Sequence, residues 1–274
     1  YLNIGKTKNQ GVEASVMYSD HVGKDFNYYV KADVWTAKNK ILYMSEEIKA
    51  ENNSHLYKTG HRIDQPYYLE ALGYYTQADI DNPDVAKPTW KDVLPGDLKY
   101  KDWNGDGVID NNDSYPFGYT ETPEITLGLN LGFTYKNFDF SAFFHAALNR
   151  TVYLDASYYK AFQNNGPISE YALGRWTSEE TAHMATYPRL TLTNEQNNYR
   201  TSTFWMCNGN FLKLRDVELG YSFKNIIPAA KADLRIFVNG TNLFAIDAVK
   251  GYDSERIGGD PAVRTISLGA NIQF

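Results

Sequence analysis

The segment from Lys101 to Asp113, KDWNGDGVIDNND, has the residue types and the spacing of a calcium-binding loop. Oxygen-bearing side chains at alternate positions can turn inward around a hard cation, and a glycine permits the sharp bend of such a loop. The predicted ligands are Asp102, Asn104, Asp106, the carbonyl oxygen of Val108, Asp110 through a water, and Asp113. The last of these positions carries Asp in place of the usual Glu, and an Asx-rich turn without a metal is the alternative interpretation.

The composition excludes several classes of protein. The chain has 274 residues, a net charge of −6 and no basic stretch that would favour a nucleic-acid partner. It has no apolar run of about 18 residues, which excludes a transmembrane helix but leaves room for barrel strands of about 9–11 residues. Cys207 is the only cysteine, which excludes an intrachain disulfide framework and a thiolate metal cluster. The chain opens at Tyr1 without a signal peptide, and we interpret it as part of a longer mature protein.

Strict alternation of apolar and polar residues predicts an all-β fold. The segment 125–135, ITLGLNLGFTY, alternates without exception over its whole length, as a strand with two different faces does. The same pattern recurs at 138–145 and 265–274, and weaker versions occur at 12–18, 26–34, 217–223 and 234–240. The sequence therefore predicts about seven long strands in an antiparallel arrangement.

The two faces of these strands favour a transmembrane barrel over a soluble sandwich, although a sandwich also alternates. Charged and amide side chains gather on one face, as in a water-filled or plugged lumen: Lys31, Asp33, Glu218, Asp233, Arg235 and Asn271. Aromatic side chains gather at the strand ends, where barrels carry interfacial girdles: Tyr18, Phe26, Tyr135, Phe138, Tyr221, Phe223 and Phe274.

The predicted connections alternate between short and long. The short ones are 19–25, 136–137 and 224–231, and the long ones are 38–124, 149–210 and 243–263. Outer-membrane barrels have short periplasmic turns and longer extracellular loops. Because the chain ends on a strand that would descend to the periplasm, all three long connections are predicted to be extracellular loops. The calcium-like segment lies in the first of them.

Several motifs, taken together, resemble the SusC/RagA-type TonB-dependent outer-membrane transporters. They are NIGKTKNQGVEASV, GDLKYKDWNGDGVIDNNDSYPFG, RWTSEE followed by YPRL, NFLKLRDVELGYSF, VNGTNLF, GYD and RTISLGANIQF, in the order of the family. The resemblance covers nearly the whole chain, so that residues 1–274 correspond to the C-terminal part of the family's barrel. The plug domain and the segment that contacts TonB have no counterpart in these residues.

The resemblance implies a function and partners. Members of this family import bulky nutrients, oligosaccharides or peptides, across the outer membrane of Gram-negative bacteria. The implied partners are a SusD-like surface lipoprotein that covers the barrel mouth and TonB, which would act through the missing N-terminal part. Barrels of this kind close with about 22 strands around a plugged lumen, so that seven strands form roughly a third of the wall.

Other features are open to a structural or a functional interpretation. The aromatic stretches 153–162 and 202–211 are able to stack on sugar rings, or to pack the loops. His145 on the polar face is either a ligand contact or a neutral, hydrogen-bonded histidine. No catalytic motif is present, and the chain is not predicted to be an enzyme. The alternative is a secreted calcium-dependent β-rich binding or adhesion module; a glycan-acting enzyme, which would need a close carboxylate pair, ranks third.

Overall fold

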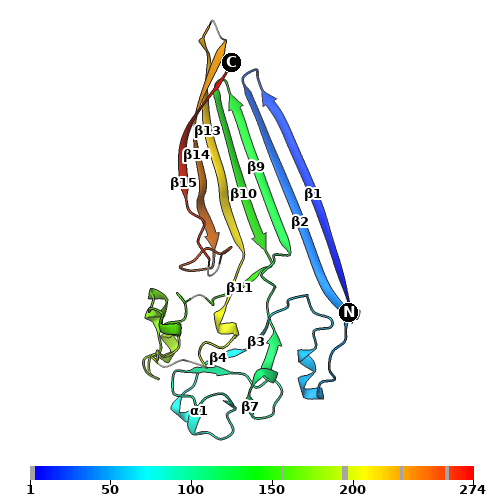
Figure 1. The fold of residues 1–274 in the computed structure, drawn as a ribbon, viewed down its shortest axis with the longest axis vertical. Helices are drawn as coiled ribbons and strands as arrows, with labels where there is room; N and C mark the ends of the chain where they lie inside the picture. Colours follow the sequence, from blue (N-terminus) through cyan, green and yellow to red (C-terminus); the bar gives the residue numbers. More distant parts are fainter. Residues whose placement is uncertain (1–3, 156, 193–196, 229–230, 257–258) are drawn as a thin grey trace.

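Seven long strands form one antiparallel sheet in the computed structural model, which describes residues 4–155, 157–192, 197–228, 231–256 and 259–274 (Figure 1). The strands are β1 (Gly5–Val22), β2 (Phe26–Met44), β9 (Ile125–Tyr135), β10 (Phe138–Leu148), β13 (Phe211–Ile227), β14 (Ala232–Asp247) and β15 (Thr265–Gln273). Each is paired with the next long strand along the chain, in the order β1-β2-β9-β10-β13-β14-β15. The predicted all-β fold with seven antiparallel strands is therefore confirmed.

Tight turns produce this meander, because each short connection returns the chain directly beside the strand it has left. Lys136 has a positive φ of 54° in the two-residue turn between β9 and β10, as two-residue hairpins require. Gly23 has a φ of 66° in the turn between β1 and β2, and Lys231 has a φ of 52° before β14. The three short links thus join neighbouring strands, as predicted.

The structure corrects the ends of several strands. The strands β1, β2, β13 and β14 contain 18, 19, 17 and 16 residues, well beyond the seven to nine expected for each. The first long connection consequently begins after Met44 and not at 38, and the third begins after Asp247 and not at 243. Polar residues occupy both faces there, so the sequence shows no alternation. The backbone still forms hydrogen bonds with the neighbouring strand, as where Lys8 pairs with Lys40.

The register groups the side chains as the alternation predicts. Lys31 lies opposite Asn130, and Glu218 lies opposite Ser141, on the polar face. On the other face, Leu131 lies opposite both Val30 and Ala142. The apolar face is open along much of the sheet, since the side chains of Leu268 and Ile266 are 80% and 75% exposed.

The three long connections gather at one end of the sheet, opposite the turns and the C-terminus, and fold into a lobe (Figure 1). Short strands pair within it: β3 (Tyr67–Leu69) with β8 (Ser114–Pro116), β4 (Ala71–Tyr74) with β6 (Leu98–Tyr100), β5 (Lys87–Pro88) with β7 (Val108–Ile109), and β11 (Thr151–Tyr153) with β12 (Met206–Asn208). Its helical segments are α1 (Gln77–Asp81), η1 (Glu51–Leu56), η2 (Asn111–Asp113), η3 (Gln163–Asn165), η4 (Glu170–Gly174), η5 (Ala182–Met184) and η6 (Thr203–Trp205).

The best-packed apolar side chains lie in this lobe and not on the sheet. One cluster of buried residues comprises Val152, Leu154, Tyr159, Ala161, Ala172, Tyr187, Trp205 and Val249. A second comprises Leu69, Leu98, Tyr100 and Ile109. In the described part of the chain, no helix has both the length and the apolar character needed to cross a membrane. The lobe thus has a core of its own, which holds the connections in a fixed shape at this end of the sheet.

Candidate functional site

The first and second long connections enclose a cavity of about 900 Å³, which we call the outer cavity. Its lining residues are Asn39, Ile63, Asp64, Pro66, Tyr68, Thr120, Glu121, Thr122, Thr151, Tyr153 and Asp155. Tyr68 and Tyr153 lie side by side in it, with ring centroids 5.2 Å apart and ring planes tilted by 43°. Seven of the eleven lining residues are polar or charged and two are tyrosines, so the cavity offers hydrogen bonds and a stacking surface to a polar ligand.

Local strand pairing positions the two tyrosines. Tyr68 lies in β3 opposite Tyr115 of β8. Tyr153 follows Val152 in β11, and the alternation of the strand buries the valine in the lobe core while the tyrosine faces the cavity. The hydroxyl of Tyr153 donates to the carbonyl oxygen of Arg200 at 3.3 Å. Burial, followed by the charges of Glu121 and Asp155, raises the pKa of Tyr68, so that its hydroxyl stays protonated at neutral pH.

Two further cavities continue from the outer cavity onto the polar face of the sheet. The inner cavity, of about 580 Å³, shares Glu121 and Thr122 with the outer cavity and also contacts Arg150 and Arg256. A sheet cavity, also of about 580 Å³, lies over β1, β2, β9 and β10. It shares Thr126 and His145 with the inner cavity. The shared residues place the three cavities next to one another in a row from the lobe to the sheet, which we call the cavity path.

Ion pairs fix the third long connection beside this path. Nζ of Lys213, in β13, lies 2.5 Å from Oδ1 of Asp253 and 2.8 Å from Oε2 of Glu255. Arg215 also pairs with Glu255, and its Nη2 lies 3.1 Å from Nδ1 of His145. Arg215 lies two residues after Lys213, so that both side chains point to the same side of the strand. Relative to β10, Arg215 is also the extra residue of a β-bulge, which brings Lys213 to the same face as Asp216.

The two carboxylates of this ion-pair cluster have perturbed acidity. Burial raises the pKa of Asp253, but hydrogen bonds from Lys213 and from the amides of Glu255 and Ala262 outweigh it, and the pKa is lowered. Burial likewise opposes the effect of Lys213 and Arg215 on Glu255, whose pKa is also lowered. Both side chains therefore stay ionised at neutral pH and hold the connection to the strand.

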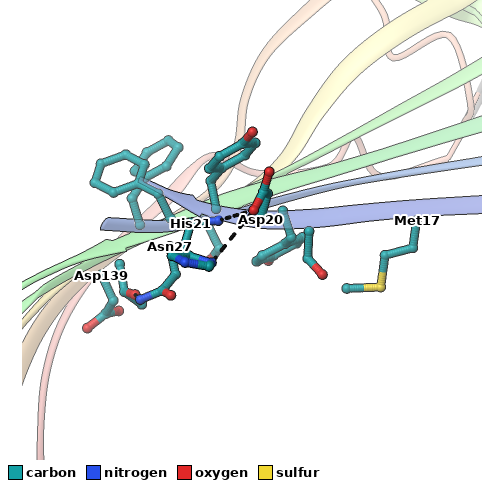
Figure 2. A pocket seen from close by; sticks show the side chains of 12 residues that line it. Met17, Asp20, His21, Asn27 and Asp139 are labelled. Atoms are coloured by element: carbon teal, nitrogen blue, oxygen red, sulfur yellow. Dashed lines mark hydrogen bonds and ion pairs between the residues drawn. The ribbon is translucent and has the colours of Figure 1, made fainter. Parts of the chain in front are cut away.

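A fourth cavity, of about 600 Å³, lies at the opposite end of the sheet, near the turns (Figure 2). Four adjacent strands, β1, β2, β9 and β10, supply its lining, which includes Met17, His21, Asn27 and Asp139. The Asp139 carboxylate there pairs with Arg235 of β14. This cavity is a hollow of the polar face itself, and no residue of the loop lobe lines it among those described.

The predicted calcium ligands occur in one compact turn, where backbone amides bind their oxygens. The carboxylate of Asp102 accepts from the amides of Gly105 at 2.6 Å and Gly107 at 2.9 Å. Oδ1 of Asp106 accepts from the amide of Val108 at 3.0 Å. Asn104 donates through its Nδ2 to Asp106, and Asp110 caps η2.

Asp113, the last predicted ligand, is completely buried. It accepts from the amides of Trp103 and Asp110, both at 2.8 Å. Burial raises its pKa, and a cation would offset the cost of this buried charge. Among the described residues, no group of three or more His, Cys, Asp or Glu side chains is arranged to hold a metal ion. The turn therefore closes on its own hydrogen bonds, and calcium binding stays a prediction.

The aromatic stretches that the sequence singled out serve mainly to pack the lobe. Tyr159 and Trp205 are fully buried in its core, whereas Tyr153 lines the outer cavity. His145 lies where the inner and sheet cavities meet and is hydrogen-bonded to Arg215, as its structural interpretation predicts. The sequence did not single out Tyr68, because its strand is only three residues long and too short for a recognisable alternation.

The seven-stranded meander with one polar face and a loop lobe at one end has the fold of a TonB-dependent transporter barrel wall. No family model matches the chain. It is similar to the TonB-dependent receptor SusC of Bacteroides thetaiotaomicron, with 28% identity over 285 residues that cover 99% of this chain and 27% of the relative. It is also similar to the TonB-dependent receptor P3 of Formosa agariphila, with 24% identity over 310 residues that cover 99% of this chain and 29% of the relative.

A solved structure described as the RagAB peptide transporter has the same fold. The TM-score is 0.71 at 20% identity, and the match covers 97% of this chain and 29% of that chain. The predicted resemblance to SusC/RagA-type transporters is thus confirmed, and the relatives are receptors and transporters, not enzymes. The chain spans about three-tenths of the length of the proteins it matches.

Proposed function

We propose that this chain forms the C-terminal part of a TonB-dependent transporter that imports bulky nutrients, oligosaccharides or peptides, across the outer membrane. The observation that carries the proposal is the row of three adjacent cavities that leads from the loop lobe to the polar face of the sheet. A solute captured in the outer cavity against Tyr68 and Tyr153 would reach the polar face without crossing the apolar one. Similarity in fold to a structure described as a peptide transporter supports peptides as one of these cargo classes.

The exposed apolar face supports placement in the outer membrane of a Gram-negative bacterium. Side chains such as Leu268 and Ile266 would face the hydrocarbon, and the polar face would line the lumen. The loop lobe would then lie outside the cell and the short turns in the periplasm. The remaining strands, the plug and the contact with TonB would come from parts of the protein outside these residues.

A SusD-like surface lipoprotein is the proposed partner at the lobe. Similarity to a receptor named SusC supports this, because such a partner accompanies the transporters that the sequence resembles. The rival function, a secreted calcium-dependent binding or adhesion module, would also use the lobe. Fractionation separates the two, since the transporter requires detergent for extraction whereas the secreted module is soluble.

Thiol labelling of intact cells tests the orientation. In the complete protein without other cysteines, Leu173→Cys in the lobe should react with a membrane-impermeant maleimide. Lys24→Cys in the first turn should react only after the outer membrane is opened. Labelling at 24 without labelling at 173 in intact cells would invert the proposed orientation.

Uptake measurements test the capture site. Tyr68→Ala combined with Tyr153→Ala should reduce uptake of labelled oligosaccharides or peptides by cells about tenfold, because both stacking surfaces are lost. Tyr43→Ala, at an exposed strand end, is the matched control and should import normally. Normal uptake by the double variant would show that these two tyrosines of the outer cavity take no part in import.

A further inference from the structure

We infer that the outer cavity selects cargo by charge, admitting uncharged and cationic solutes and excluding anionic ones, and that Asp64 and Glu121 set this selection. The inference rests on the proposed function, since it concerns what enters the path.

The lining of the outer cavity carries negative charge only. Asp64, Glu121 and Asp155 are its ionisable carboxylates, and the described lining contains no Lys, Arg or His. Asp155 is neutralised by an ion pair with Lys160, whose side chain is only 3% exposed. Asp64 and Glu121 are exposed and form no ion pair with a described residue. Two carboxylate residues without an ion pair to a described residue therefore line the cavity.

Two arginines near the cavity, Arg62 and Arg150, already have partners of their own, as Lys160 has in Asp155. Nε of Arg62 lies 2.6 Å from Oε1 of Glu124, and its guanidinium lies over the ring of Tyr119. Arg150 donates to the carbonyl oxygens of Glu121 and Gly209. Neither guanidinium lines the outer cavity, and both are held away from an entering anion.

Hydrogen-bonding chemistry leads to the same selection. Ionised carboxylates accept hydrogen bonds and cannot donate them, so a bound solute must supply hydroxyl, amide or ammonium donors. The face of the Tyr68 ring carries negative quadrupole potential, which favours C–H groups and cations over anions, whereas the ring of Tyr153 already has the Lys160 ammonium over it at 5.2 Å. An acidic sugar or peptide would bring a like charge to this lining without gaining a counter-ion.

Glu121 lies where the outer and inner cavities adjoin, so a solute that moves from one to the other passes it. Glu121 lines both the outer and the inner cavity. The cationic Arg150 and Arg256 contact only the inner cavity. A solute therefore passes the carboxylates before it reaches any guanidinium.

Reactivity of an engineered thiol measures this selection directly. Thr122→Cys in the complete, otherwise cysteine-free protein places a thiol between the two cavities, at an exposed side chain. The probes are a cationic and an anionic methanethiosulfonate of matched size, and Leu173→Cys supplies the reference ratio of their rates. At about 0.1 M salt, we expect the ratio of the cationic to the anionic rate to be about tenfold higher at position 122 than at position 173.

Adding Asp64→Asn and Glu121→Gln should bring the ratio to the reference value, as should about 1 M salt. Asp84→Asn with Glu180→Gln removes the same charge from exposed positions outside the cavity and should leave the preference unchanged. Two outcomes would overturn the inference. One is a ratio of rates at Thr122→Cys that equals the reference ratio at Leu173→Cys. The other is that the two double variants change the ratio at position 122 equally. Labelling of the thiol at position 122 does not depend on import. If the protein imports its cargo but the thiol shows no preference between the reagents, charge selection is wrong and the proposed function stands.

Discussion

Lys213 and Asp253, which are separated by 40 positions in the sequence, form a nearly buried ion pair with 2.5 Å between Nζ and Oδ1. Their side chains are only 5% and 9% exposed. This pair, together with Glu255, ties the third long connection to β13 beside the inner cavity. Two of the predictions below depend on it.

Removing Lys213 should release the third connection. Breaking a buried ion pair by deleting one partner costs about 3–5 kcal/mol, because the remaining charge loses its compensation. We expect Lys213→Met to make Arg256 a rapid site of trypsin cleavage while the barrel stays assembled. Lys58→Met, at an exposed position of the first connection, is the control. Cleavage at an unchanged rate would show that other contacts hold the connection.

Acid should release the same connection. The pKa values of Asp253 and Glu255 are lowered in the folded protein. Their contribution to stability is therefore complete when the pH is above the pKa of an unperturbed carboxyl group, and it is lost as the pH falls through the lowered pKa values. Without the carboxylate charges, the basic side chains of Lys213 and Arg215 lose the partners that offset their mutual repulsion. A spin label at Arg256→Cys should gain mobility below about pH 4. An immobile label down to pH 2 would contradict this.

Calcium should order the loop 102–113. The ring of Trp103 stacks on Tyr115 at 3.9 Å, and its amide donates to Asp113, so closure of the loop should change its fluorescence. We expect a saturable change with a Kd of about 10⁻⁴–10⁻³ M, as in extracellular calcium modules. Asp106→Ala should abolish the change and raise protease cleavage within 80–124, whereas Asp84→Ala should behave as wild type. Identical titrations of both variants would leave only a metal-free Asx turn.

Adjacent residues of β15 should respond oppositely to a charge. Leu268 pairs with Val238 on the apolar face, and Ser267 pairs with Asn239 on the polar face. Leu268→Arg should cost about 2–4 kcal/mol near the bilayer midplane and lower the amount of folded barrel on unheated gels. Ser267→Arg should be tolerated, because Asp216 is hydrogen-bonded to Asn239 there and would attract the new cation. Equal loss of folded barrel would refute the assigned faces.

The sequence by itself determined the sheet. Unbroken alternation over 125–135 specified both a strand and its two faces, because side chains of a strand point alternately to either side. The lengths of the connections then placed all three long ones at one end, since each short turn reverses the chain. Where polar residues replaced apolar ones, as around Lys38 and Lys40, the alternation failed, and pairing with β1 extended the strand instead.

Only the tertiary structure decided which loop residues meet. Tyr68 and Tyr153 come from different connections, as do Glu121 and Asp155, and no periodicity relates them. Their proximity depends on how the lobe core packs around Trp205 and Tyr187, a long-range arrangement that local sequence patterns do not encode. The bulge at Arg215, which brings Lys213 to the same face as Asp216, is equally invisible in the sequence, because one extra residue between paired strands changes the side to which the preceding side chains point without changing the pattern around it.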